Sequence, residues 1–444
     1  MKQLPGQQWV CNVCGFSIEG DTPPDNCPQC GTDRDHFEKI YPAGTRYLII
    51  GAGIAGVSAA DAIHQADPNA KIVLLSDETE LPYFRMNLTR YLAGELDDSK
   101  LDLHSRAWYL ENDIELHLNS KVVDINAQER LVFTADGRSF AYDRLILTTG
   151  ASPFVPPFAG AHLPGVQTLR TLRDANAILS VCSRPVNVVC IGGGLLGLEV
   201  AGAISKRGAN VSVVESLPWL LPRQLDQPAS RILQQKIEAM GIHVYTGAKT
   251  KALVGLEHVE AVELEDGSSL PADLVIISAG VSANLELAHK AGLAVNRGII
   301  VDDTMRTSDP NIYAAGDDTE YQGRMYGLWV PAKSQGTIAG FSAAGKPARF
   351  VSDPPSARLK VLGIDLFSIG EITPTQSGDV LLADQSDGNY ASFLFREGVL
   401  RGSILLGDAS LAAPVKSAVE AQRNFSAELA RGISAADFKK VIKA

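Results

Sequence analysis

The stretch Tyr47-Leu-Ile-Ile-Gly51-Ala-Gly53-Ile-Ala-Gly56 sets the architecture, because an apolar strand passes through a glycine turn into a predicted helix at Val57–His64. A second strand is expected at Lys71–Leu75. In this context the glycines allow a tight turn, close approach of a pyrophosphate and close helix packing, and the helix N-terminus favours an anion. The stretch predicts a dinucleotide-binding unit rather than a purely structural glycine turn.

The same order of elements returns later in the chain. A strand is predicted at Val186–Ile191, glycines follow at Gly192–Gly197, and a helix is expected at Leu198–Arg207. The next strand, Asn210–Val214, ends at Glu215. A carboxylate there can accept hydrogen bonds from a ribose 2′-hydroxyl and would repel a 2′-phosphate. The second unit is therefore predicted to bind NADH in preference to NADPH.

Four cysteines near the N-terminus form two similar pairs, Cys11-Asn-Val-Cys14 and Cys27-Pro-Gln-Cys30, separated by twelve residues. Each pair is followed by a glycine, so a tight turn can direct backbone N–H groups at sulfur. Tetrahedral coordination by sulfur alone selects zinc or iron, and the spacing leaves both open. Flanking aromatic residues and a neighbouring redox cofactor favour iron. The aromatic residues are Trp9, Phe16 and Phe37.

Composition narrows the class of protein. The chain has 444 residues, 45% of them hydrophobic, which suggests about three domains. The net charge of -11 and the lack of clustered Lys and Arg argue against nucleic-acid binding. The chain contains no uninterrupted run of about 18 apolar residues, so no membrane span is predicted. Cys182 and Cys190 form no disulfide framework, so we expect a reducing, cytoplasmic location.

The segment after the second unit has a different pattern. Small residues and prolines in Ala339–Pro354 indicate a domain boundary. Beyond it we predict an α+β domain at 350–444. Its expected strands are Ala357–Phe367, Tyr390–Phe395 and Val399–Leu405, and its expected helix is Ala412–Arg431.

Two further motifs, Leu145-Ile-Leu-Thr-Thr-Gly150-Ala151 and Asn311-Ile-Tyr-Ala-Ala-Gly316-Asp317, carry a family resemblance. From Arg46 to about Phe367 the chain resembles the pyridine-nucleotide-dependent flavoprotein reductases, which include rubredoxin reductase and the flavoprotein part of assimilatory nitrite reductase. The N-terminal segment resembles the rubredoxin domain of rubrerythrins. Supporting motifs are Leu81-Pro-Tyr-Phe-Arg85, Leu88-Thr-Arg90-Tyr-Leu-Ala-Gly94-Glu95 and Leu359-Lys-Val-Leu-Gly-Ile-Asp-Leu-Phe-Ser-Ile-Gly370.

The resemblance implies an α/β chain with two Rossmann-like dinucleotide-binding domains, a metal-stapled rubredoxin-like domain and an α+β C-terminal domain. Its first dinucleotide domain would bind FAD and be discontinuous. The expected domains are 1–40 for the metal, 46–150 with 280–344 for FAD, 151–279 for NAD and 350–444 at the C-terminus, with a linker near Tyr41–Thr45.

The resemblance also implies roles for single residues. Asp317 would contact the flavin ribityl chain, and Glu78, favoured over Asp77, would bind a ribose hydroxyl. Glu199 would lie close to nicotinamide and flavin, and Arg90 stands where relatives often carry Lys near the flavin ring; these two are the catalytic candidates. The other predicted cofactor-binding residues are Gly51, Ala52, Gly53, Ala55, Gly56, Arg85, Val122, Thr148, Gly150, Gly192, Gly194, Gly197, Glu215 and Gly280.

One departure excludes a branch of similar enzymes. NADH oxidases, NADH peroxidases and coenzyme A disulfide reductases place a redox cysteine shortly after the first acidic strand. The matching stretch here, Pro82–Leu92, contains no cysteine, and the second unit has no Cys-x-x-Cys pair. Thiol chemistry is therefore not expected at the flavin.

We accordingly expect a reductase that passes hydride from NADH to FAD and then single electrons to a fused rubredoxin-type iron. Rubrerythrin, a flavodiiron protein or superoxide reductase would be suitable downstream acceptors, and a homodimer is possible. One alternative is an NADH oxidase or diaphorase with a structural zinc module. The other is a redox-sensing binding protein.

Overall fold

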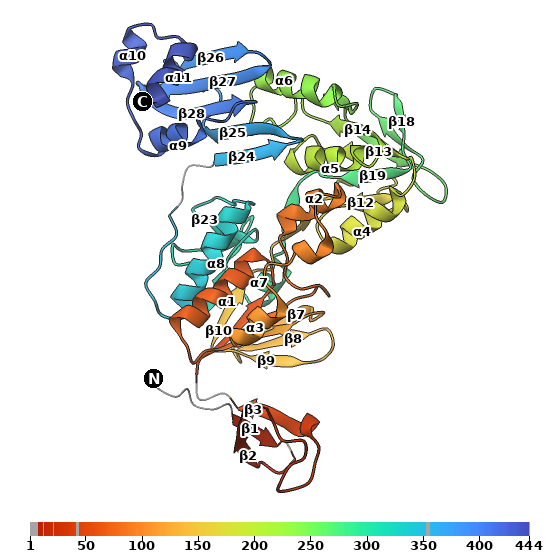
Figure 1. The fold of residues 1–444 in the computed structure, drawn as a ribbon, viewed down its shortest axis with the longest axis vertical. Coiled ribbons are helices and arrows are strands. Elements are labelled where there is room, and N and C mark those ends of the chain that lie inside the picture. Colours follow the sequence, from red (N-terminus) through yellow and green to blue (C-terminus); the bar gives the residue numbers. More distant parts are fainter. Residues whose placement is uncertain (1–7, 12, 21, 41–43, 352–355, 444) are drawn as a thin grey trace. The chain divides into compact units, whose positions relative to one another are not determined.

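A computed structural model describes residues 8–11, 13–20, 22–40, 44–351 and 356–443 (Figure 1). The chain forms two compact units, each assembled from several segments. The first contains Met1–Pro82, His104–Gly150 and Leu285–Phe350, and the second contains Tyr83–Leu103, Ala151–Asn284 and Val351–Ala444. Residues 83–103, expected in the FAD domain, thus group with the second unit, as does the C-terminal region. Residues 41–43 of the predicted linker lie outside the described residues.

The N-terminal module is a small antiparallel sheet in the order β2-β1-β3. Its core consists of Cys11, Cys27 and Phe37, with Trp9 and Phe16 packed against them. So small a core needs a staple, because modules below about 40 residues rarely fold on apolar burial alone. The elements are β1 (Gln8–Cys11), β2 (Ser17–Glu19), the short helix Arg34–His36 and β3 (Phe37–Ile40).

The rest of the first unit is built on a parallel sheet in the order β22-β10-β4-β5-β6. Its strands are almost wholly buried, as expected for a parallel sheet covered on both faces. The strands are β4 (Arg46–Ile50), β5 (Lys71–Leu75), β6 (Ile114–His117), β10 (Arg144–Leu147) and β22 (Ile312–Ala314). Smaller sheets are formed by β7 (Val122–Asn126), β8 (Leu131–Thr134) and β9 (Ser139–Ala141), and by β21 (Ile299–Val301) and β23 (Thr319–Tyr321).

Two helices of the first unit pack closely together. Helix α1 (Ile54–Ala66) lies against α8 (Trp329–Ala343), as Figure 1 shows. A Cβ on Gly336 would lie 2.1 Å from the Ala55 carbonyl oxygen, so only glycine permits this approach. Helix α8 also continues to Ala343, which corrects the prediction of a loose stretch from Ala339. The remaining helices are α3 (Arg106–Glu111) and α7 (Glu286–Lys290).

The second unit repeats the parallel arrangement in the order β12-β19-β13-β14-β15. Helix α5 starts at Leu195, immediately after Gly194, so the glycine run is shorter than predicted, and α1 likewise starts at Ile54. The elements are β12 (Val166–Thr168), α4 (Leu172–Val181), β13 (Asn187–Ile191), α5 (Leu195–Ser205), β14 (Asn210–Glu215), α6 (Gln227–Glu238), β15 (His243–Thr246) and β19 (Leu274–Ile277). Smaller elements are α2 (Leu88–Leu92), β11 (Ala151–Pro153), β16 (Thr250–Val254), β17 (Ala261–Leu264), β18 (Ser269–Pro271) and β20 (Val281–Ala283).

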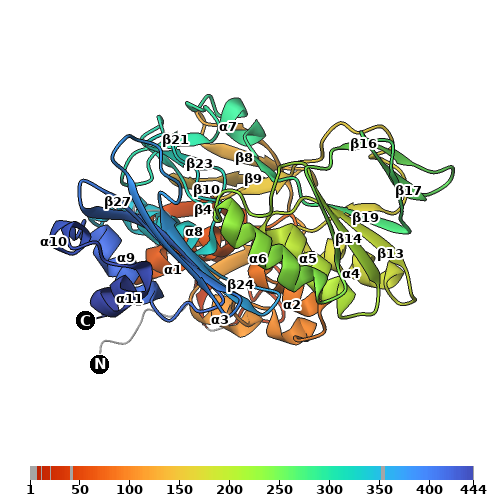
Figure 2. The same cartoon turned by 90° about the horizontal axis from the view of Figure 1, so that it is seen from above.

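The C-terminal region of this unit is an antiparallel sheet in the order β24-β25-β28-β27-β26. Helices α9 and α11 cover one face (Figure 2) through Phe438 and Val415, which pack on Phe393. The other face packs on the core of α5 and α6 through Tyr390 and Ile404. Because both faces are covered, β27 is an almost continuous apolar run. The strands are β24 (Ser356–Val361), β25 (Ile364–Gly370), β26 (Val380–Ser386), β27 (Asn389–Arg396) and β28 (Val399–Leu406).

Two predicted elements of this region were wrong. The strand Ala357–Phe367 is a hairpin, because Leu362 and Gly363 both take positive φ, of 52° and 82°, and turn the chain back. The helix Ala412–Arg431 breaks near Gln422, at a φ of 48°, because the Phe425 N–H donates to the Gly398 carbonyl and its ring enters the core. The helices observed are α9 (Ala412–Glu420), α10 (Ser426–Ala430) and α11 (Ala435–Lys443).

Among the helices that the structure describes, none is both long and apolar enough to cross a lipid bilayer.

Candidate functional site

The first glycine turn joins β4 to α1 and depends on two glycines for its shape. Gly51 has a φ of +103°, and a Cβ there would lie 2.1 Å from the Thr148 carbonyl oxygen. A Cβ on Gly56 would lie 2.0 Å from the Gly51 carbonyl oxygen. A Cβ on Gly53, in contrast, would meet no atom of the described chain within 4 Å. The open space beside Gly53 fits a ligand that approaches the backbone closely.

Thr148 holds this turn from the end of β10. Its N–H donates to the Ile50 carbonyl, and its Oγ1 donates to the carbonyls of Ile50 at 3.0 Å and Gly51 at 2.7 Å. The side chain is buried, so these bonds satisfy a hydroxyl that water cannot reach. Sequence reasoning named Thr148 only among the cofactor-binding residues and did not predict that it holds the turn.

The turn after β22 contains two adjacent acids. Asp317, predicted to contact flavin, is half-buried, whereas Asp318 is fully buried. The Asp318 carboxyl accepts hydrogen bonds from Thr149 Oγ1 at 2.7 Å and from the Gly150 N–H at 3.1 Å. Asp318 therefore connects the two motif turns, a role that sequence reasoning missed. The doubled acid after Gly316 was its only signal.

The other residues predicted for FAD in the first unit surround these turns. Asp77 is exposed and Glu78 is partly buried, one and two residues beyond the Ser76 that follows β5. The Glu78 N–H donates to Ser76 Oγ. Ala52 is partly exposed, Ala55 is buried at the start of α1, and Val122 is buried at the start of β7.

The second glycine turn, between β13 and α5, has the same steric design. Gly192 has a φ of +116°, and a Cβ there would lie 2.4 Å from the Ser278 carbonyl oxygen. A Cβ on Gly197 would lie 2.0 Å from the Gly192 carbonyl oxygen, while one on Gly194 would meet nothing described within 4 Å. Gly280, just beyond β19, has a φ of +111° and also faces open space.

Glu215 at the end of β14 is buried and holds this second turn. Its Oε2 accepts from the Gly193 N–H at 2.7 Å, and its Oε1 accepts from the Leu217 N–H at 2.7 Å. Charge-assisted bonds of this kind are short and strong. The carboxylate predicted to read the ribose thus also fixes the backbone of the phosphate turn.

The two catalytic candidates in the second unit bond to different partners. Glu199 on α5 is mostly buried, which raises its pKa, and it accepts a hydrogen bond from Thr89 Oγ1 at 3.1 Å. Arg90 is exposed and pairs with Glu95 at 3.4 Å. Thr89, not Arg90, is therefore the residue of α2 that reaches Glu199. No pattern in the sequence singled out Thr89.

Arg85 is held beside α4 in the same unit. Its Nη1 donates to the Arg170 carbonyl, and its guanidinium lies 5.2 Å from the centre of the Tyr83 ring. Arg85 is partly buried, and these contacts hold its side chain in position.

The four cysteine sulfurs all lie within 4.8 Å of one another, and the Cys11–Cys30 and Cys14–Cys27 pairs are each 3.6 Å apart. A tetrahedral ion with metal–sulfur bonds of ~2.3 Å would separate its ligands by roughly 3.8 Å, so the set fits such an ion. The two knuckles are alike. Gly15 and Gly31 have φ values of +75° and +76°, and their N–H groups donate to the Cys11 and Cys27 carbonyls.

His36 and the other two cysteines stay outside this set. His36 is exposed and hydrogen-bonded to Asp33, and Cys182 and Cys190 are buried. Burial raises the pKa of Cys190 to about 12, which fits an inert core residue.

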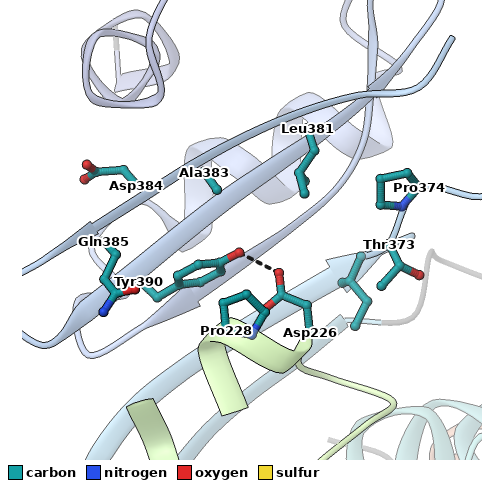
Figure 3. Close-up of a pocket in the computed structure, with 10 residues that line it drawn as sticks. Asp226, Pro228, Thr373, Pro374, Leu381, Ala383, Asp384, Gln385 and Tyr390 are labelled. Atoms are coloured by element: carbon teal, nitrogen blue, oxygen red, sulfur yellow. Dashed lines mark hydrogen bonds between the residues drawn. The ribbon is translucent and has the colours of Figure 1, made fainter. Parts of the chain in front are cut away.

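One cavity of about 410 Å³ lies within the second unit, and none of its lining residues belongs to the glycine turn of that unit (Figure 3). Leu381 and Pro374 form part of its wall, and Tyr390 Oη donates to Asp226 Oδ2 at 2.5 Å at its base. Asp226 also caps α6 through the Ala229 N–H. This bond links β27 to the start of α6, and a structural role accounts for both side chains.

Three family models match different parts of the chain. The family model described as pyridine nucleotide-disulphide oxidoreductase matches residues 45–336. The model of the rubredoxin NAD+ reductase C-terminal domain matches residues 355–423, and that of the rubrerythrin rubredoxin-like domain matches residues 9–38.

Individual relatives agree with these matches. The chain is 35% identical to the rubredoxin-NAD(+) reductase of Pseudomonas putida, over 81% of this chain and 99% of that one. It is 36% identical to the assimilatory nitrate reductase electron transfer subunit of Bacillus subtilis, over 82% of this chain but only 48% of that protein, so it spans about half the length of that curated relative. The crystal structure of NADH:rubredoxin oxidoreductase from Clostridium acetobutylicum superposes with a TM-score of 0.74 at 30% identity, covering 86% of this chain and 96% of that one.

Proposed function

The chain belongs to the pyridine nucleotide-disulphide oxidoreductase family, with a rubredoxin reductase C-terminal domain and a rubredoxin-like four-cysteine domain, and we propose that it is an NADH:rubredoxin reductase fused to its own acceptor. NADH would deliver hydride to FAD in the first unit, and single electrons would pass to iron in the four-cysteine module. The fused cysteine cluster is the observation that carries this proposal.

The first unit suits FAD. The open space beside Gly53 and the buried Asp318 Oδ1, which has no partner among the described residues, both fit a cofactor that contacts backbone and buried polar atoms. When bound, FAD would supply the conversion of a two-electron hydride into single electrons. The α1 N-terminus would favour the pyrophosphate, and Glu78 and Asp317 would bind cofactor hydroxyls.

The second unit would bind NADH. Gly192, Gly194 and Gly197 would admit the pyrophosphate, and Glu215 would favour an unphosphorylated ribose. Glu199 would face the nicotinamide, and Thr89 supports this assignment by fixing its carboxyl orientation. Arg90 keeps only the role implied by the resemblance, because its pairing with Glu95 offers no support.

The four cysteines would hold iron, which supplies a one-electron acceptor. Backbone hydrogen bonds from Phe16 to Cys14 and from Thr32 to Cys30 would stabilise thiolate charge. Tethering would keep the acceptor at an effective concentration in the millimolar range if the linker reaches. A separate protein such as rubrerythrin, a flavodiiron protein or superoxide reductase would take the electron onward.

A visible absorption spectrum of the purified protein, before and after anaerobic addition of NADH, tests the proposal. We expect flavin and ferric-thiolate bands, both bleached by NADH, with NADPH less effective. Cys11→Ser should abolish the ferric-thiolate band and leave flavin bleaching in place. Zinc in the module after iron-replete expression would favour the NADH oxidase or diaphorase alternative, and absence of NADH turnover would favour a redox-sensing binding protein.

A further inference from the structure

Asp318 joins two segments that are far apart in sequence. Its side chain is fully buried, and its Oδ2 accepts from Thr149 Oγ1 at 2.7 Å and from the Gly150 N–H at 3.1 Å. Those donors follow β10, whereas Asp318 follows β22. One carboxyl oxygen therefore sets the spacing between the two turns that the family resemblance assigns to FAD.

The second oxygen of this carboxyl lacks a partner. Asp318 Oδ1 is buried and makes no hydrogen bond within the described residues. It lies 3.9 Å from the position that a Cβ on Gly316 would take, and that position is 3.2 Å from the Ala55 side chain at the start of α1. The oxygen is thus close to the first glycine turn. A buried polar atom left unpaired costs about 1–3 kcal/mol, so its partner is expected to be a ligand or an ordered water.

A second unpaired atom belongs to a side chain that bonds to the same turn. Gln335 of α8 is buried, and its Oε1 accepts from the Gly316 N–H at 3.0 Å and from Thr319 Oγ1 at 3.1 Å. Its Nε2 has no partner among the described residues. Asp318 and Gln335 therefore both hydrogen-bond within the protein, and each side chain retains one polar atom without a described partner.

The charge state of Asp318 supports a role toward an anionic ligand. The pKa of Asp318 is raised to about 7, mainly by burial and to a smaller extent by the neighbouring Asp317 carboxylate, while the hydrogen bonds from Thr149 and Gly150 act in the opposite direction. Ala55 from α1 and Gln335 from α8, which pack at the same turn, are neutral. Near neutral pH the carboxyl can carry a proton, so Oδ1 can donate a hydrogen bond instead of repelling a phosphate-bearing molecule.

We propose that Asp318 is a positioning residue of the FAD site, which fixes the Thr149–Gly150 turn through Oδ2 and completes its hydrogen bonding through Oδ1 only when FAD is bound. The inference rests on the proposed FAD site at Gly51–Gly56. It assigns Asp318 to that site and specifies that the protonated form of Asp318 favours FAD binding.

Titration of the full-length apoprotein with FAD tests the assignment. Asp318→Ala leaves Thr149 and Gly150 without their acceptor, so the Kd for FAD should rise about tenfold to a hundredfold. Asp318→Asn can accept from both donors and donate from its amide, so binding should stay within about threefold of the wild type. Glu320→Gln is the matched control, because that buried carboxylate already has protein partners in Asn296, Arg297 and Gly298.

The pH dependence separates positioning from simple structural support. FAD carries negative charge on its pyrophosphate, so it should favour protonated Asp318 and bind more tightly at pH 6 than at pH 8, by up to about tenfold per pH unit. Asp318→Asn should remove this dependence, whereas Glu320→Gln should retain it. The visible spectrum of bound flavin should shift in Asp318→Ala and match the wild type in Glu320→Gln.

The stability of the apoprotein gives a readout without cofactor. The pKa of Asp318 is higher in the folded chain than its ordinary value of 3.8, so the folded state binds more protons between these values and stability falls as pH rises from about 4 to about 7. Asp318→Asn should lack this fall. If wild-type apoprotein binds FAD and Asp318→Ala binds it equally well, the inference is wrong; if the wild type binds no FAD, the proposed function fails instead.

Discussion

The two glycine turns share one steric design and differ in what holds it. In each, the first glycine N–H donates to the end of the next strand, at Leu75 or Val214, and a Cβ on that glycine would collide with a carbonyl of a third strand. In each, a Cβ on the last glycine of the motif, Gly56 or Gly197, would lie 2.0 Å from the carbonyl oxygen of the first. This part of the design follows from backbone geometry and is the same in both units.

The difference lies in the side chains at matched positions. Thr148 and Ser278 both donate their N–H to the strand before the turn, but only the Thr148 hydroxyl bonds to the turn; the Ser278 hydroxyl has no partner among the described residues. The matched residues at the ends of the neighbouring strands are Ser76, which follows β5, and Glu215, the last residue of β14. The first turn is therefore held by a neutral hydroxyl and the second by a carboxylate. If Glu215 also selects the cofactor, as we propose, cofactor choice and the shape of the turn depend on one residue only in the second unit.

The largest expected effect tests the shared design. Gly51→Ala places a Cβ 2.1 Å from a backbone carbonyl at a φ of +103°, so we expect a loss of about 2–5 kcal/mol of stability. Gly53→Ala is the control, because its Cβ meets no described atom within 4 Å. It should leave the denaturation midpoint of the apoprotein unchanged and weaken FAD binding. Equal destabilisation by both changes would show that steric contact does not set the shape of the turn.

The next effect tests the coupling at the second turn. Glu215→Ala leaves the Gly193 and Leu217 N–H groups without their acceptor, which should cost about 2–3 kcal/mol and weaken NADH and NADPH together. The ratio of kcat/KM for NADH to that for NADPH should also fall toward one, because the charge that repels a 2′-phosphate is gone. Glu215→Gln separates the two effects, since it removes the charge and keeps one acceptor. If Glu215→Ala narrows the ratio with no loss of NADH affinity, the carboxylate does not support the turn.

The sequence predicted the parts of this comparison that depend on short spacing. Glycines three residues apart between a strand and a helix, and cysteines three residues apart before a glycine, are local patterns with one physical meaning. The residues that brace them come from distant segments. Thr148 reaches Gly51 across 97 residues, and Asp318 reaches Gly150 across 168. No local pattern distinguishes such a residue from any other polar residue after a strand.

The missed elements of the C-terminal region have a related cause. The hairpin at Leu362 and Gly363 interrupts a run of apolar residues that resembles one strand, and the helix break near Gln422 occurs because Phe425 gains burial in the core. In both places tertiary packing overrides local preference. The family resemblance implied a place for Arg90 near the flavin ring, and it did not predict that the preceding residue, Thr89, donates a hydrogen bond to Glu199.

A smaller effect should separate Thr148 from its counterpart. Thr148→Val keeps the shape of the side chain and removes the one hydroxyl donor shared by the Ile50 and Gly51 carbonyls, so we expect a loss of about 1 kcal/mol, less than for Glu215→Ala. Ser278→Ala is the matched control, because its hydroxyl has no described partner, and it should be neutral or slightly stabilising. Chemical denaturation of the two apoprotein variants measures the difference. A larger loss of stability in Ser278→Ala than in Thr148→Val would contradict the claim that only the Thr148 hydroxyl holds its turn.

The smallest effect concerns the helices that leave the two turns. Two residues after the third glycine, α1 carries the buried Ser58 and α5 carries Glu199, so only the second helix places an acid there. Variants of two adjacent residues of α2, Arg90 and Thr89, test which of them acts on Glu199. Arg90→Ala breaks an exposed pair with Glu95, which is worth about 0–1 kcal/mol, and should leave the rate of flavin reduction by NADH within about threefold.

Thr89→Val provides the contrast on the same helix. It removes the hydrogen bond that lowers the raised pKa of Glu199, so the pKa should rise further and any dependence of flavin reduction on this group should move to higher pH. Stopped-flow flavin reduction across pH measures both variants. Because Arg90 and Thr89 are adjacent, a general disturbance of α2 would affect both profiles, whereas a role through Glu199 would move only that of Thr89→Val. A strong loss of rate in Arg90→Ala with an unshifted Thr89→Val profile would return the catalytic role to Arg90, as the family resemblance implies, and would make Glu199 a structural residue of α5.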